Sequence, residues 1–132
     1  NDFFIVARVE SFILGKNLKD AIKRANAYSA AGADAILIHS KEKNPNQIFQ
    51  FAKQFKKSKF YKPMIAVPST YSKTYEKELI KNGFKVVIYA NQLLRAAYPQ
   101  MLSTAKRILQ TGRAHDVEKN ISPISEVINL IK

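Results

Sequence analysis

Four short apolar runs alternate with segments of helical periodicity, and this alternation restricts the fold more than any other feature of the sequence. The apolar runs occupy residues 3–10, 35–38, 63–68 and 85–90. Such alternation predicts parallel strands joined by right-handed helical crossovers. We therefore expect an α/β fold in which four parallel βα units and a terminal helix form one domain over residues 1–132. Four such units could form a small open sheet or half of an eight-stranded barrel.

The first apolar run, residues 3–10, has the sequence FFIVARVE. It predicts a strand buried on both faces, as in a parallel sheet covered by helices. A charged side chain is not stabilised inside an apolar strand. We therefore expect Arg8 to face a cavity at the carboxyl end of the strand. A guanidinium there offers a rigid fork of donors to a carboxylate or a phosphoryl group.

Two predicted helices carry sequence signals for their ends. Gly32 should close the helix that follows the first strand, as a C-terminal cap. Asn44 should cap the next helix, with Pro45 at its first position and Gln47 reaching back to the cap.

The sequence after the fourth strand predicts a long helix and a short one. Pro99 lies inside the long apolar stripe, where it should kink or restart the helix. Residues 111–120 are polar and predict a loop. Ser122 should then cap a last helix that begins at Pro123.

Composition excludes several classes of protein. The sequence has no cysteine, so it has no disulfide and no cysteine-ligated metal site. The net charge of +12 suggests nucleic acid as a partner, but the lysines are spread over the polar faces of the predicted helices. Only residues 53–62 form a dense basic run. We expect a solvated basic surface and no nucleic-acid partner, and a non-catalytic basic binding module is the alternative.

The sequence also bears on location. No apolar run approaches the roughly 20 residues of a membrane helix, so we expect no membrane contact and a cytoplasmic protein. The first residues, Asn1 and Asp2, show no signal-peptide pattern and lead at once into a predicted strand. We therefore expect the chain to be the later part of a longer polypeptide.

Each predicted strand ends in polar residues. These are Arg8 and Glu10, His39 and Ser40, Ser69 and Thr70, and Asn91 and Gln92. Because parallel strands end at the same edge of a sheet, where ligands bind in α/β folds, we expect these side chains to form one rim.

The rim predicts a site for a small polyanion. Arg8 would hold the negative charge of the ligand, and His39 would donate a hydrogen bond or a proton. Each residue has a structural alternative: Arg8 as a salt-bridge partner, His39 as a structural histidine, and the others as turn or cap residues.

Metal-ligand spacing and phosphate-loop motifs are absent from the sequence. The aspartates stand away from the predicted rim, on strand starts, helix faces and loops: Asp2, Asp20, Asp34 and Asp116. If the chemistry needs a carboxylate-held Mg²⁺, we expect none of its ligands in this chain.

Four blocks of sequence together resemble the phosphoenolpyruvate mutase family of the isocitrate lyase superfamily. They are IVARVE at residues 5–10, AGADAILIHS at 31–40, VPSTY at 67–71 and YANQLLRAAYP at 89–99. The resemblance implies the second half of a (β/α)₈ barrel. It also implies a Mg²⁺ enzyme of phosphonate biosynthesis that interconverts phosphoenolpyruvate and phosphonopyruvate by moving a phosphoryl group between the enol oxygen and carbon 3.

The resemblance also assigns site residues. The anion-binding arginine of the family matches Arg8 and its active-site histidine matches His39, and Ser40 joins them as an expected substrate contact. Related carbon–carbon lyases usually have glutamate at the histidine position, so His39 favours phosphorus chemistry. Gln92 stands where the family often has histidine, which weakens a role for that position.

The first half of the barrel would carry the other functional parts of the family. These are the metal-binding aspartates, the catalytic aspartate and the gating loop that separates the mutase from phosphonopyruvate hydrolase. Hydrolysis of phosphonopyruvate, or another 2-oxo acid lyase reaction, therefore remains the alternative, and we expect this chain alone to be inactive. Its outer strands, residues 3–9 and 85–90, would have unpaired edges.

The resemblance finally implies a homo-oligomer, because members of the superfamily exchange their terminal helix and form dimers of dimers. Residues 122–132 have one apolar stripe that would suit such an exchange. Packing of this helix on its own barrel is the alternative.

Overall fold

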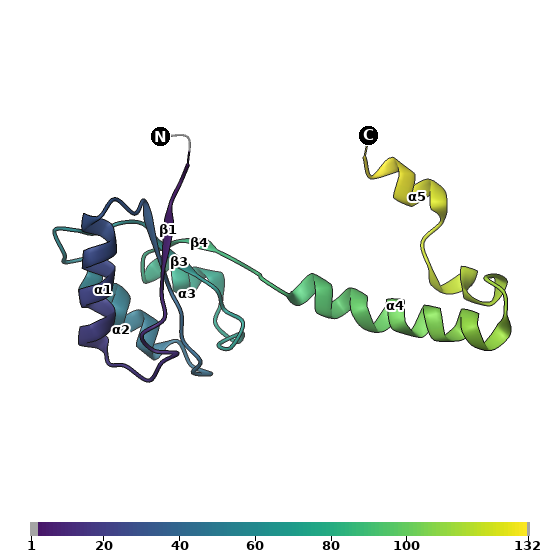
Figure 1. Ribbon diagram of the computed structural model, residues 1–132, viewed down its shortest axis with the longest axis horizontal. Coiled ribbons are helices and arrows are strands. Elements are labelled where there is room, and N and C mark those ends of the chain that lie inside the picture. The colour runs from purple at the N-terminus through teal and green to yellow at the C-terminus, as the bar shows by residue number, and fades with distance from the viewer. Residues whose placement is uncertain (1–2, 132) are drawn as a thin grey trace. The chain divides into compact units, whose positions relative to one another are not determined.

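The computed structural model describes residues 3–131, and the chain divides into two compact units, residues 1–90 and 91–132. In the first unit, strands and helices alternate as the sequence predicts (Figure 1). The elements are β1 (Val6–Val9), α1 (Leu18–Ala30), β2 (Ala35–Ile38), α2 (Asn46–Phe55), β3 (Met64–Ala66), α3 (Glu76–Lys81) and β4 (Phe84–Val87). The strands pair in the order β1-β2-β3-β4, and every pair is parallel.

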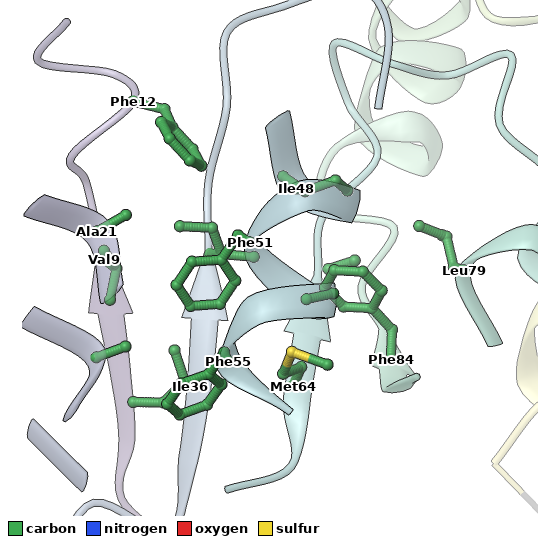
Figure 2. Packing of buried hydrophobic residues seen from close by; sticks show 14 of the residues in the cluster. Val9, Phe12, Ala21, Ile36, Ile48, Phe51, Phe55, Met64, Leu79 and Phe84 are labelled. Atoms are coloured by element: carbon green, nitrogen blue, oxygen red, sulfur yellow. The ribbon is translucent and has the colours of Figure 1, made fainter. Parts of the chain in front are cut away.

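The core of this unit lies between the sheet and its three helices. Strand residues such as Val9, Ile36 and Met64 meet Phe51 and Phe55 of α2, and all five are fully buried (Figure 2). The rings of Phe51 and Phe55 stack with 5.3 Å between their centroids. Each large side chain that is fully buried in this way contributes about 1.5–3 kcal/mol to stability.

The opposite face of the sheet is only partly covered. The pairing of Val6 with Ala35 and of Arg8 with Leu37 places these four residues on one face, beside Ile65. Ala35, Leu37 and Ile65 are buried, whereas Val6 and Arg8 are exposed. The prediction that the first strand is buried on both faces is therefore wrong. The reason is that β1 is an edge strand and the core helices pack on the other face.

The unpaired edges of the sheet are shorter than predicted. Pairing in β1 begins at Val6, and the apolar residues before it are exposed, as the 83% exposure of Phe3 shows. In β4 the strand ends at Val87, although the amide of Ile88 still donates to the carbonyl of Ala66 at 2.9 Å.

The helix ends follow the sequence signals in part. Gly32 has φ +107° just after α1, which confirms its capping role because glycine adopts this conformation without a steric penalty. Pro45 occupies the N-cap position of α2, one residue before the helix, and the Asn44 side chain accepts from the amide of Asn46 at 3.1 Å. The Gln47 prediction is wrong: its side chain accepts from the Ser40 hydroxyl instead of returning to the cap.

The second unit contains α4 (Gln92–Thr111), the 3₁₀ helix η1 (His115–Asn120) and α5 (Ile124–Asn129). Pro99 lies inside α4, which continues through it without a restart. The predicted loop over 111–120 is wrong, because Gly112 at φ +66° ends α4 and the next turn is already helical by His115.

The prediction for Ser122 is also wrong. Pro123 takes the N-cap position of α5 with no side-chain hydrogen bond, so the helix begins one residue later than expected. Lys132, at the end of the predicted terminal helix, lies outside the described residues. Within residues 3–131, no helix combines the length and the apolar character needed to cross a membrane.

Candidate functional site

Arg8 and His39 are in direct contact at the carboxyl ends of β1 and β2. The strands are in register up to Val9 and Ile38, and the amide of His39 donates to the carbonyl of Val9 at 3.3 Å. Side chains 31 residues apart are thereby brought together, with 2.7 Å between Arg8 Nη2 and His39 Nδ1. Arginine has no acceptor, so a hydrogen bond at this contact requires Nδ1 of His39 to accept, which would leave the ring proton on Nε2.

Glu10 completes a cluster of three side chains. One of its carboxylate oxygens, Oε1, accepts from Arg8 Nε and lies 3.5 Å from His39 Nδ1. The cluster is open to solvent, with exposed fractions of 55% for Arg8, 34% for Glu10 and 21% for His39. The structure thus brings these three predicted rim residues together. Their roles toward a substrate stay predictions.

Ser40 is fully buried, unlike the three residues of the cluster. Its hydroxyl donates to Gln47 Oε1 at 2.6 Å and accepts from the amide of Glu42 at 3.1 Å. These bonds tie the loop after β2 to the start of α2. Ser40 therefore has a structural part in this loop, and its contact with substrate stays a prediction.

The loop after β3 is joined to the loop after β2. The hydroxyl of Thr70 donates to the carbonyl of Ser40 at 2.8 Å, so Thr70 uses its side chain to hold two strand exits together. Ser69 is half-buried, and its amide donates to the carbonyl of Val67 at 2.8 Å. Asn91 is the first residue of the second unit and is exposed there. Its place on the rim stays a prediction.

Tyr71 anchors the same loop, and sequence reasoning gave it no role. It is fully buried in the core, and among the described residues its hydroxyl has no hydrogen-bond partner. Burial raises the pKa of this phenol to about 12. The signal available in the sequence was an aromatic residue directly after Ser69 and Thr70, a position from which a ring can return to the core.

Asp20 and Asp34 make hydrogen bonds that hold local structure together. Asp20 accepts from the hydroxyl of Ser11 at 2.7 Å and from Arg24 Nε at 2.9 Å. The Ser11 bond, followed by that from Arg24, holds the pKa of Asp20 below its usual range. Asp34 accepts from the amide of Ile5 at 2.8 Å. Asp2 lies outside the described residues.

The cluster of Arg8, Glu10 and His39 does not fit a magnesium ion. Within residues 3–131, no three side chains among histidine, aspartate and glutamate converge as metal ligands. Mg²⁺ prefers several oxygen ligands in octahedral geometry. Here one carboxylate is already bonded to a guanidinium, whose charge repels a cation. The cluster is instead suited to a carboxylate or phosphoryl oxygen.

Together these features place the chain in the class of parallel α/β proteins, which includes open sheets and barrels. Its four parallel strands equal half the number in an eight-stranded barrel, and polar residues follow the carboxyl ends of the strands, where α/β proteins bind their ligands.

The chain belongs to the phosphoenolpyruvate phosphomutase family, whose sequence profile matches residues 1–109. It is 43% identical to phosphoenolpyruvate phosphomutase of Tetrahymena pyriformis and 35% identical to phosphonopyruvate hydrolase of Variovorax sp.. Both alignments cover 98% of this chain, but only 42% and 44% of those proteins. The chain therefore spans less than half the length of these relatives.

Solved structures confirm the fold. Phosphoenolpyruvate phosphomutase from Streptomyces platensis subsp. rosaceus has a TM-score of 0.84 at 39% identity, with 98% of this chain and 44% of that one covered. Phosphonopyruvate hydrolase in complex with oxalate and Mg²⁺ has a TM-score of 0.83 at 35% identity, with 98% and 45% covered. The resemblance to this family and the half-barrel fold are thus confirmed.

Proposed function

We propose that this chain is the carboxyl-terminal half of an enzyme that interconverts phosphoenolpyruvate and phosphonopyruvate. The reaction moves a phosphoryl group between the enol oxygen and carbon 3, so that a carbon–phosphorus bond forms in one direction and breaks in the other. The observation that carries this proposal is the contact between Arg8 and His39 at the strand ends. The relatives named phosphoenolpyruvate phosphomutase support it.

Arg8 and His39 would stabilise the transferring group electrostatically. The guanidinium of Arg8 retains N–H groups that can bind phosphoryl or carboxylate oxygens, and His39 presents an Nε2–H donor. Phosphoryl transfer depends chiefly on positioning and on charge stabilisation by such groups. The family resemblance implies Mg²⁺, and we propose that its ligands lie in the first half of the barrel.

Arg8→Ala in the full-length enzyme tests the proposal. Removal of the guanidinium should lower kcat by about 100-fold or more, the scale measured when a preorganised charge-stabilising donor is lost. Arg24→Ala is the matched control, because Arg24 pairs with Asp20 on α1, outside the cluster. Turnover of Arg8→Ala near that of the control would remove Arg8 from the reaction.

Phosphonopyruvate hydrolysis is the second candidate. A solved hydrolase matches this chain with the same TM-score of 0.84 as the solved phosphomutase. Product analysis on phosphonopyruvate separates the two reactions, because a mutase yields phosphoenolpyruvate and a hydrolase yields pyruvate and phosphate.

Oligomerisation and location complete the proposal. The helices α4 and α5 carry exposed apolar side chains, among them Leu94 at 66% and Ile128 at 61%. Exposed apolar surface of this kind favours association, and we expect a homotetramer with exchanged terminal helices. We also expect the enzyme to act in the cytoplasm, in phosphonate biosynthesis. Light scattering of the full-length enzyme measures the oligomeric state, and a monomer would contradict this part.

A further inference from the structure

Glu10 carries a negative charge in a site that we propose for an anionic substrate. Its carboxylate lies within the same cluster as Arg8 and His39, where it repels any negatively charged ligand. Its side chain is only 34% exposed, so solvent does not fully screen that repulsion. Because the charge of Glu10 opposes substrate binding, this residue must have another role in the site.

We propose that Glu10 is a positioning residue that fixes the guanidinium of Arg8 and, through Arg8, the ring of His39. This assignment rests on the proposed anion site. A guanidinium has five N–H groups; one is held by Glu10 and one by His39, which leaves three for the substrate. The carboxylate thus sets which edge of the guanidinium remains free.

The effect of Glu10 reaches His39 through the guanidinium of Arg8, which contacts Glu10 at Nε and His39 at Nη2. With Arg8 Nη2 at 2.7 Å, His39 Nδ1 is an acceptor and Nε2 carries the proton. Without Glu10, the long side chain of Arg8 regains its rotamer freedom and leaves Nδ1 without a fixed donor. The ring is then free to adopt the other tautomer, in which Nε2 cannot donate to a phosphoryl oxygen.

A direct pair between Glu10 and a protonated His39 is the competing arrangement. The distance from Oε1 to Nδ1 is 3.5 Å, which is longer than the 2.7 Å from Arg8 Nη2 to the same nitrogen. Nδ1 has one lone pair or one proton, so it serves only one of these partners at a time. The shorter contact favours Arg8, and the two arrangements predict different protonation of the ring.

The kinetic test uses Glu10→Ala and Glu10→Gln in the full-length enzyme. Glu10→Ala should lower kcat by about 10- to 100-fold, as expected for misplaced catalytic groups, while KM stays equal or falls because a repelling charge is gone. Glu10→Gln keeps an acceptor for Arg8 Nε and should recover at least half of that loss on a logarithmic scale. Glu118→Ala, at an exposed carboxylate in η1, is the control.

Three kinetic results would overturn the proposal. One is wild-type kcat in Glu10→Ala. Another is a raised KM at unchanged kcat, which would make Glu10 a substrate contact. The third is a Glu10→Gln variant as slow as Glu10→Ala, which would show that the negative charge itself is needed.

A second measurement does not depend on turnover. Long-range ¹H–¹⁵N spectra of the histidine ring report which nitrogen is protonated, and we expect Nε2–H in the wild type and a mixture of tautomers in Glu10→Ala. An imidazolium or an Nδ1–H ring in the wild type would overturn the proposal. If the wild type makes neither phosphoenolpyruvate nor pyruvate from phosphonopyruvate, the proposed function fails, and the ring spectra still decide the role of Glu10.

Discussion

The two units of this chain differ in how they use apolar residues. The first unit packs three helices on a sheet and fully buries large side chains such as Phe51 and Tyr71. In the second unit α4 has no buried residue, although apolar residues recur along its 20 residues. The difference shows that an apolar stripe becomes a core only where a second layer of structure covers it.

The largest effect that tests this comparison is expected at Phe51. Phe51→Ala leaves a cavity under the sheet and should lower the free energy of unfolding by about 3–5 kcal/mol. Leu109→Ala is the matched change in the second unit, where the side chain is 85% exposed, and should alter stability by no more than about 0.5 kcal/mol. Urea unfolding measures both, and equal losses would break the contrast between the units.

A smaller effect is expected in the middle of α4. Pro99 has no amide to bond within the helix, and Pro99→Ala should stabilise α4 by up to about 3 kcal/mol. Hydrogen exchange should therefore slow for the amides around residue 99 and stay unchanged in α1. Unchanged protection in α4 would mean that contacts elsewhere already determine its stability.

Alkaline pH should affect the first unit through Tyr71. Its pKa is raised to about 12 in the folded chain, so the folded state holds this proton after an unfolded tyrosine has lost it. The stabilisation is complete below about pH 10 and falls by about 2 kcal/mol as pH rises to 12. Urea unfolding at pH 9 and pH 11 should show this loss of stability. Tyr71→Phe should remove the part of the pH dependence that comes from this phenol.

The smallest effects concern one aspartate in each unit. Hydrogen bonding to Ser11 and then to Arg24 lowers the pKa of Asp20, and bonding to Arg113 lowers that of Asp116. Lowered values mean that each stabilises the folded chain above about pH 4 and that this contribution is lost as pH falls further. Asp20→Asn and Asp116→Asn should each slightly reduce the fall in the free energy of unfolding as the pH drops below about 4. A steeper profile in either variant would contradict the assignment.

Short-range signals in the sequence predicted the order of the elements well. The strand at residues 35–38 has the predicted ends, and Gly32 closes α1 as expected. Both depend on periodicity and on the φ preference of glycine, which act within a few residues. The predictions for Gln47 and Ser122 fail because neither side chain caps its helix: Gln47 accepts from the Ser40 hydroxyl, and Pro123 occupies the N-cap position of α5.

The sequence by itself determined that polar residues follow each strand and that Arg8 and His39 stand at two of these ends. Only the tertiary structure decided that Glu10 and His39 share one guanidinium, that Ser40 is buried and bonds Gln47, and that β1 is exposed on one face. The physical reason is distance along the chain. Strand pairing fixes which side chains meet across 31 residues, and that pairing depends on the packing of the whole sheet rather than on any local pattern.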